Sequence, residues 1–138
     1  MRLGLSSEAA PDASLGDLIR FATRRGLATL ELRDGEAIGT SGDYHRYFEM
    51  AGQRYCHLLD PRTGFPATGT QAVTVLIAPG PSGGMRSDAL SKPIFIAGRE
   101  WRSMAAKLGV TSVLKVGADG TASATPAMRA RLKIEVPD

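Results

Sequence analysis

The spacing of apolar residues in the first part of the chain is typical of a helix. Ser14 is a residue type preferred at helix N-caps, and Gly26 is well placed to end the helix, which we expect over residues 15–25. The apolar positions at helical spacing are Leu15, Leu18, Ile19 and Ala22. Residues 2–5 before it suit a short strand.

After this helix, apolar residues recur at every second position, which predicts strands. Residues 27–32 and 36–41 alternate around Asp34-Gly35, a dipeptide typical of a hairpin turn. Residues 46–50 and 54–59 are expected to form a second hairpin around Ala51-Gly52.

Further along the chain, the run 60–64 (DPRTG) predicts a turn, because Pro presets φ, Gly supplies positive φ and Asp bonds back to the turn backbone. The β-rich run 71–78 is expected at the centre of the sheet. Ser87 is predicted to cap a helix that starts at Asp88, and Pro93 requires that helix to begin late or to kink.

In the last third of the chain, we expect a helix over residues 100–109 and a strand over 110–116. A turn over 117–120 and a closing strand over 130–136 follow. We therefore expect an α+β fold with a mainly antiparallel sheet and two or three helices. With 138 residues, the chain suits a single domain, over 1–138.

Composition excludes several classes of protein. Hydrophobic residues make up 43% and charged residues 22%, which are globular values, and no apolar run is long enough to span a membrane. The net charge is +3, but the Lys and Arg residues are not grouped in a dense basic block. We therefore expect no nucleic-acid partner. Cys56 is the single cysteine, which rules out an intrachain disulfide, and its neighbour His57 would point to the opposite strand face.

Three stretches combine polar groups with turn-forming residues: 40–44 (TSGDY), 57–64 (HLLDPRTG) and 83–92 (GGMRSDALSK). Ser41 lies in the first stretch. The second stretch contains His57, Asp60 and Arg62, which could together bind a phosphate. Asp88 in the third is a candidate ligand for Mg²⁺. The alternatives are an ordinary turn around Ser41, an Asp60–Arg62 ion pair beside an exposed His57, and a helix-capping Asp88.

These stretches, in this order, resemble the ApbE family of flavin transferases. Residues 40–66 resemble that family's hallmark region, which ends in H-x-x-D-P-R-T-G-x-P, and residues 87–98 (SDALSKPIFIAG) resemble a later A-D-A-L-[AS]-T-A segment. The similarity is strongest over residues 28–124, and residues 1–26 are a loop and helix outside the recognised part.

The resemblance implies an activity. Members of the family cleave FAD with the help of Mg²⁺ and transfer FMN to a Thr hydroxyl of an acceptor protein, releasing AMP. His57 would then contact the flavin dinucleotide, with Ser41, Asp60 and Arg62 as further cofactor-binding residues, and Asp88 would bind the metal. The expected partners are flavin nucleotide and an acceptor flavoprotein, with a homo-oligomer as a further candidate. Residues 1–14 lack the apolar core of a signal peptide, whereas family members are often periplasmic.

Two departures from the family pattern keep a second hypothesis open. The resemblance is to the C-terminal portion of a protein about twice as long, and Lys92 stands where the family has a metal-binding Thr. A protonated Lys has no lone pair for Mg²⁺. Its ammonium could meet a phosphate directly, or it could pair with Asp88 one helical turn away. The alternatives to an FMN transferase are a non-catalytic module that binds flavin nucleotide or a partner protein, and a structural remnant.

Overall fold

The computed structural model describes residues 29–30, 33–44 and 46–133, and it groups the chain into two compact units. The larger unit comprises residues 32–131, and the smaller comprises 1–31 and 132–138. In the smaller unit, β1 (Thr29–Leu30) pairs antiparallel with β8 (Leu132–Lys133). The helix expected over 15–25 and the strand over 2–5 lie outside the described residues, and the single-domain assignment stays a prediction.

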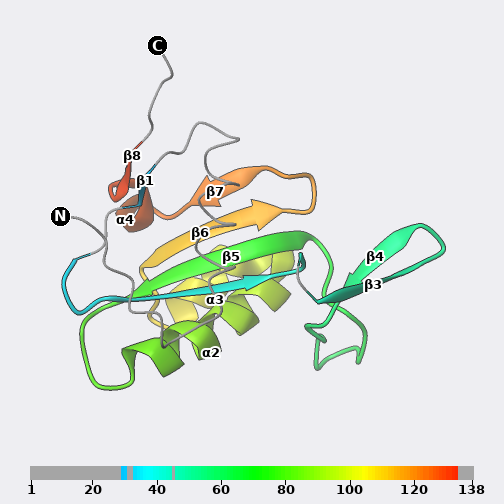
Figure 1. Ribbon diagram of the computed structural model, residues 1–138, viewed down its shortest axis with the longest axis horizontal. Coiled ribbons are helices and arrows are strands. Elements are labelled where there is room, and N and C mark those ends of the chain that lie inside the picture. Colours follow the sequence, from blue (N-terminus) through cyan, green and yellow to red (C-terminus); the bar gives the residue numbers. More distant parts are fainter. Residues whose placement is uncertain (1–28, 31–32, 45, 134–138) are drawn as a thin grey trace, which may run out of the picture. The chain divides into compact units, whose positions relative to one another are not determined.

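A four-stranded antiparallel sheet forms the centre of the larger unit (Figure 1). Its order is β2-β5-β6-β7, and the strands are β2 (Ala37–Gly42), β5 (Thr70–Ile77), β6 (Ser112–Gly117) and β7 (Ala122–Ala124). β5 lies between two partners, which confirms the central position predicted for residues 71–78. The expected strand 110–116 is confirmed as β6.

The predicted hairpin between residues 27–32 and 36–41 is wrong in its pairing. The Asp34-Gly35 turn does form, with φ 74° at Gly35 and a bond of 3.2 Å from the Glu36 N–H to the Arg33 carbonyl. β2, however, pairs with β5 along its whole length, from Ala37 opposite Ile77 to Gly42 opposite Ala72. β5 is almost entirely buried and offers β2 a longer apolar partner than the two-residue β1.

The second predicted hairpin is confirmed and projects from one end of the sheet (Figure 1). β3 (Tyr47–Met50) and β4 (Gln53–Cys56) are joined by Ala51 and Gly52, whose φ values are 51° and 76°. Two successive residues with positive φ match the type I′ turn, which has the twist that a tight hairpin needs.

Helices α2 (Gly83–Ile96) and α3 (Trp101–Lys107) pack on one face of the sheet, joined by the short 3₁₀ helix η1 (Gly98–Glu100) (Figure 1). α3 confirms the helix predicted over residues 100–109. The α+β class with an antiparallel sheet is also confirmed. β7 and the one-turn helix α4 (Pro126–Arg129) were not predicted, although Thr125 before Pro126 is a typical N-cap, and its Oγ1 accepts the Met128 N–H.

The predicted start of the long helix is wrong. α2 begins at Gly83, four residues before Ser87, and its N-cap is Ser82 with φ 80° and no side-chain cap bond. The Ser87 hydroxyl instead donates to the Gly84 carbonyl at 2.8 Å, inside the helix. The helix also continues through Pro93, because Ile94 and Phe95 beyond it are fully buried.

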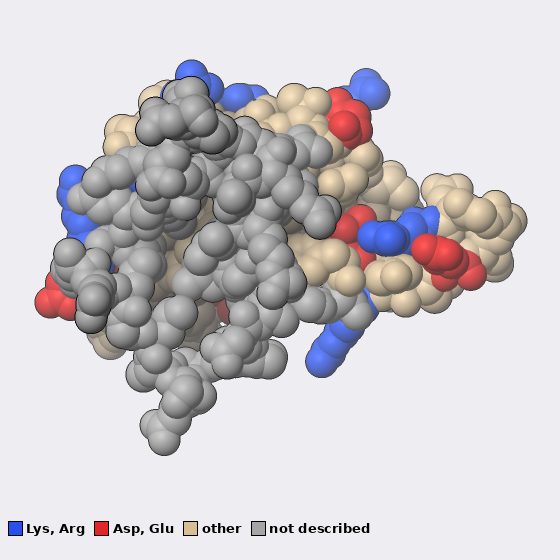
Figure 2. Space-filling model, turned by 45° about the horizontal axis from the view of Figure 1, so that its top comes forward, with Lys and Arg blue, Asp and Glu red and all other residues tan. Residues whose placement is uncertain are grey.

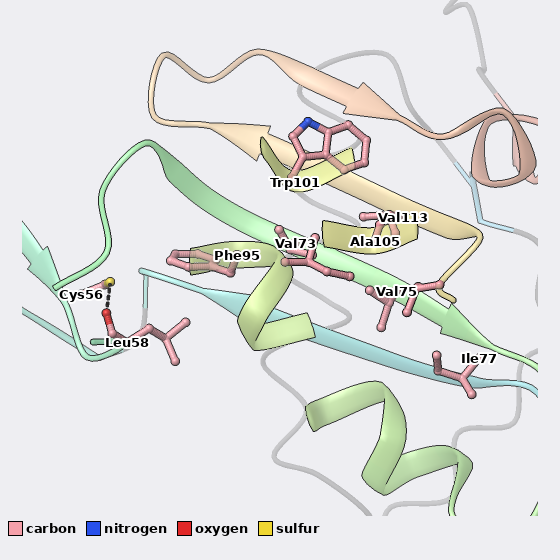
Figure 3. Close-up of a cluster of buried hydrophobic side chains, with 11 residues drawn as sticks. Cys56, Leu58, Val73, Val75, Ile77, Phe95, Trp101, Ala105 and Val113 are labelled. Atoms are coloured by element: carbon pink, nitrogen blue, oxygen red, sulfur yellow. Dashed lines mark hydrogen bonds between the residues drawn. The ribbon is translucent and has the colours of Figure 1, made fainter. Parts of the chain in front are cut away.

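The core lies between the helices and the facing side of the sheet (Figure 3). Alternate residues of β5 and β6 meet α2 and α3 there, as expected for strands with one face on a core. Buried members are Cys56, Leu58, Val73, Val75, Ile77, Ile94, Phe95, Trp101, Ala105, Val110 and Val113. Among the described residues, no helix combines the length and the apolar character that crossing a membrane requires.

Candidate functional site

The polar end of β2 is tied to α2 through two buried hydroxyl groups. The Ser41 and Ser91 Oγ atoms are 2.7 Å apart, and Ser91 also donates to the Asp88 carbonyl at 2.9 Å. Because the single Ser91 proton goes to that carbonyl, Ser41 is the donor in the pair. Ser41 therefore lies in the protein interior and holds β2 against α2, and its role as a cofactor contact stays a prediction.

A close approach of backbone to backbone positions this part of α2. A Cβ atom at Gly39 would lie 2.4 Å from the carbonyl carbon and oxygen of Ser87. Only a residue without a side chain permits that contact, so Gly39 sets how deeply α2 sits on β2. Gly39 was not predicted as a functional or packing residue, although a glycine inside an otherwise strand-like run is a signal for a close backbone approach.

The DPRTG turn is closed by its own backbone and by an ion pair. The Thr63 and Gly64 N–H groups donate to the Asp60 carbonyl at 3.1 and 2.8 Å, and Gly64 has φ 73°. The Arg62 Nη2 lies 2.7 Å from Asp60 Oδ2, and the Arg62 backbone N–H donates to Oδ1 at 2.9 Å. The Arg62 side chain thereby holds the pKa of Asp60 below its usual range.

His57 lies on the exposed face before this turn. Its Nδ1 is 3.0 Å from the Arg46 carbonyl, which can only accept a bond. Nδ1 therefore carries a proton, and Nε2 is left for another contact. Cys56 is buried on the other face, with its thiol 3.5 Å from the Leu58 carbonyl, so the two side chains form no catalytic pair.

These two stretches meet at one end of the sheet. The Leu58 carbonyl accepts the Ala67 N–H at 2.8 Å just before β5 begins, and the Asp43 N–H donates to the Gln71 carbonyl at 3.0 Å where β2 ends. Burial raises the pKa of Asp43, and the charge of Arg54 opposes that change. The structure thus brings the end of the TSGDY stretch and the HLLDPRTG stretch to the same end of β5.

Asp88 and Lys92 form an ion pair on the surface of α2, one turn apart. The Lys92 Nζ lies 2.6 Å from Asp88 Oδ1 and donates to the Asp88 carbonyl at 3.1 Å. Among the residues that the structure describes, no three His, Cys, Asp or Glu side chains gather to hold a metal ion. A Mg²⁺ ion at Asp88 would have to displace the Lys92 ammonium, and the described residues offer no cluster of further ligands there, so the metal-binding role of Asp88 stays a prediction.

Comparisons with known proteins point to one family. The model of the ApbE family matches residues 11–114. The FAD:protein FMN transferase of Rhodobacter capsulatus is 44% identical over 108 residues, which are 78% of this chain and 20% of that protein. The transferase of the same name from Vibrio cholerae is 44% identical over 70 residues, which are 50% of this chain and 20% of that protein.

Solved structures give the same result for the fold. The ApbE protein of Thermotoga maritima superposes with a TM-score of 0.60 at 35% identity, covering 70% of this chain and 31% of its own. The apo form of the flavinyl transferase ApbE of Pseudomonas stutzeri superposes with a TM-score of 0.57 at 32% identity. This match covers 75% of this chain and 33% of that protein. The matched part is about a fifth to a third of these relatives. Because the family model matches most of this chain, over residues 11–114, the chain belongs to the ApbE family.

Proposed function

We propose that this chain provides part of the flavin-nucleotide site of an FAD:protein FMN transferase. The observation that carries the proposal is the end of the sheet where residues 57–64 and the end of β2 come together, within the segment matched by the family model. The names of the relatives supply the reaction. The remaining part of the active site would correspond to segments of the relatives that this chain does not cover.

In the proposed reaction, the acceptor Thr oxygen forms a bond to the phosphorus of the FMN half of FAD. The pyrophosphate bond to the AMP half breaks, AMP leaves with the bridging oxygen, and the Thr hydroxyl proton is released. Arg62 would contribute by binding a phosphate oxygen, for which its planar guanidinium is well suited. His57 would contact the dinucleotide through Nε2, the ring nitrogen that Arg46 leaves available.

The second candidate is a module that binds flavin nucleotide without catalysis, and the Asp88–Lys92 pair favours it. In place of a metal, the Lys92 ammonium would neutralise phosphate charge. An exposed ion pair is worth less than about 1 kcal/mol, so Lys92 can leave Asp88 for a phosphate at low cost. Where Figure 2 shows described residues, basic and acidic side chains lie near one another around the edge of this face.

A fluorescence titration of the purified chain with FAD tests the proposal. We expect saturable binding, and we expect Arg62→Ala to weaken it about tenfold, because a charge-assisted bond to phosphate is lost. Lys107→Ala, which removes an exposed cation at the end of α3, serves as the matched control and should leave the affinity unchanged. Absence of saturable binding by the native chain would refute both candidates for this chain alone.

Lys92 gives a separate prediction about metal dependence. We expect FAD to bind the native chain equally well in Mg²⁺ and in excess EDTA, and we expect Lys92→Met to weaken binding about tenfold through loss of the ammonium. The opposite result would be an FAD affinity that falls when Mg²⁺ is chelated. If Asp88→Ala then removed this dependence on Mg²⁺, Asp88 would be assigned as a metal ligand instead. Release of AMP in the presence of a Thr-containing acceptor peptide distinguishes the transferase from the binding module.

A further inference from the structure

A concavity of about 450 Å³ lies beside β7 and α4. It is lined by Arg102, Ala124, Pro126, Arg129 and Ala130. We propose that Arg102 and Arg129 form an anion-binding pocket for a small phosphate-bearing molecule. Nothing in the family motifs points to this pocket, because the two arginines are far apart in sequence and lie outside all three candidate stretches.

Arg102 is held in place by the core. Its guanidinium carbon lies 4.2 Å from the centre of the Trp101 ring, and Trp101 is only 3% exposed. This cation–π contact with a buried indole restrains the position of the exposed Arg102 guanidinium. A ligand that binds there does not have to immobilise a flexible side chain, which lowers the entropic cost of binding.

The charge of the pocket is not neutralised from within. Arg62 and Arg131 are paired with Asp60 and Glu36, whereas neither lining arginine is ion-paired with a carboxylate of the described residues. The charge of Arg102 also acts on Lys115 of β6. There, burial lowers the pKa of Lys115, Asp119 opposes that effect and the Arg102 charge adds to it. Two like charges at one concavity favour an anion between them.

The lining indicates the class of anion. A phosphate monoester carries nearly two charges at neutral pH and matches two guanidinium forks, whereas a carboxylate matches one. Ala124, Pro126 and Ala130 supply short, mostly apolar walls, and a volume of about 450 Å³ leaves room for an organic group beyond the phosphate.

The pocket shares no residue with the proposed flavin site. Ala124 belongs to β7, at the edge of the four-stranded sheet opposite β2, whereas Arg102 is nearer to the flavin motifs, since Glu100 two residues before it interacts electrostatically with Arg62. The pocket proposal does not depend on FAD binding, so a chain that fails to bind FAD could still bind phosphate here.

Trp101 provides a built-in reporter, because it is the only tryptophan in the chain and it contacts Arg102. We expect inorganic phosphate, added at constant ionic strength, to change its fluorescence with half-saturation at about 1 mM. Direct quenching by the ion is excluded by the burial of the indole. Arg129→Ala, which leaves the Arg102–Trp101 contact in place, should raise the half-saturation concentration about tenfold or more, because a charge-assisted bond is lost.

The control is Arg99→Ala, which removes an exposed arginine outside the pocket and should leave the titration unchanged. Line broadening of the phosphorus NMR signal repeats the measurement without relying on Trp101, and far-ultraviolet circular dichroism confirms that each variant is folded. If neither fluorescence nor line width shows saturation, or if Arg129→Ala and Arg99→Ala have the same effect, the proposal is overturned.

Discussion

The variant Gly39→Ala is expected to lose about 3 kcal/mol of unfolding free energy, because an added methyl group overfills a close contact. The new Cβ would lie 2.4 Å from the Ser87 carbonyl and 2.9 Å from the Asp88 backbone nitrogen. These are backbone atoms of α2, so no side-chain rotation relieves the clash and the helix must move away from β2. Urea unfolding followed by circular dichroism measures the loss.

The matched control is Gly84→Ala, a change of the same size within α2. A Cβ atom at Gly84 meets no other atom within 4 Å, and alanine favours helix over glycine by about 1 kcal/mol. This variant should therefore be slightly more stable than the native chain. Equal stabilities for the two variants would show that β2 and α2 do not pack as closely as described.

The second large effect is expected from Glu36→Gln, which should cost about 2 kcal/mol because it weakens a pair of charge-assisted hydrogen bonds in a largely buried site. Arg131 donates to the two Glu36 oxygens at 3.1 and 2.6 Å, and both side chains are 11% exposed. Glu49→Gln is the control. It alters the exposed Glu49–Arg54 pair, with its 4.0 Å separation, and should cost less than about 1 kcal/mol.

The same ion pair predicts a pH dependence. The hydrogen bond from Arg131 lowers the pKa of Glu36 below its usual range, although burial opposes this effect. A lowered pKa stabilises the folded chain above the unfolded-state pKa, and the contribution disappears as the pH falls through the folded-state value. Acid titration of the native chain should therefore show a loss below about pH 5 that Glu36→Gln lacks. Parallel pH profiles for the two proteins would contradict this assignment.

Local sequence signals predicted the elements that depend on neighbouring residues. The Ala51-Gly52 hairpin and the DPRTG turn form as expected, because positive φ at the glycines and the Asp60 side chain fix them without distant help. The strand over residues 71–78 was also predictable, since its continuous apolar run requires cover on both faces.

Predictions failed where a distant contact decided the outcome. Residues 36–41 pair with β5 rather than with the nearer strand, and α2 starts at Gly83 because glycines near its start allow close packing. A Cβ atom at Gly83 would lie 3.1 Å from that of Ala37, a contact made across more than forty residues. Helix propensity alone favours a later start, at Ser87, because it takes no account of such a contact.

The candidate site was predictable in its residues but not in all of their surroundings. The sequence predicted that His57 lies just before the turn that contains Asp60 and Arg62, and the structure has them there. It could not show that Ser41 faces Ser91 inside the protein, or that Asp88 pairs with Lys92. Arg102 and Arg129 carry no local signal, because only the fold brings α3 and α4 to one concavity.

The Glu36–Arg131 pair also has a topological consequence. It joins residues separated by 95 positions, at the two ends of the larger unit. The backbone between them is thus nearly a closed ring in space, and unit ends that lie together are the arrangement that tolerates circular permutation. A short linker across the pair, with new termini at the exposed Ala51-Gly52 turn, would keep every strand pairing of the four-stranded sheet.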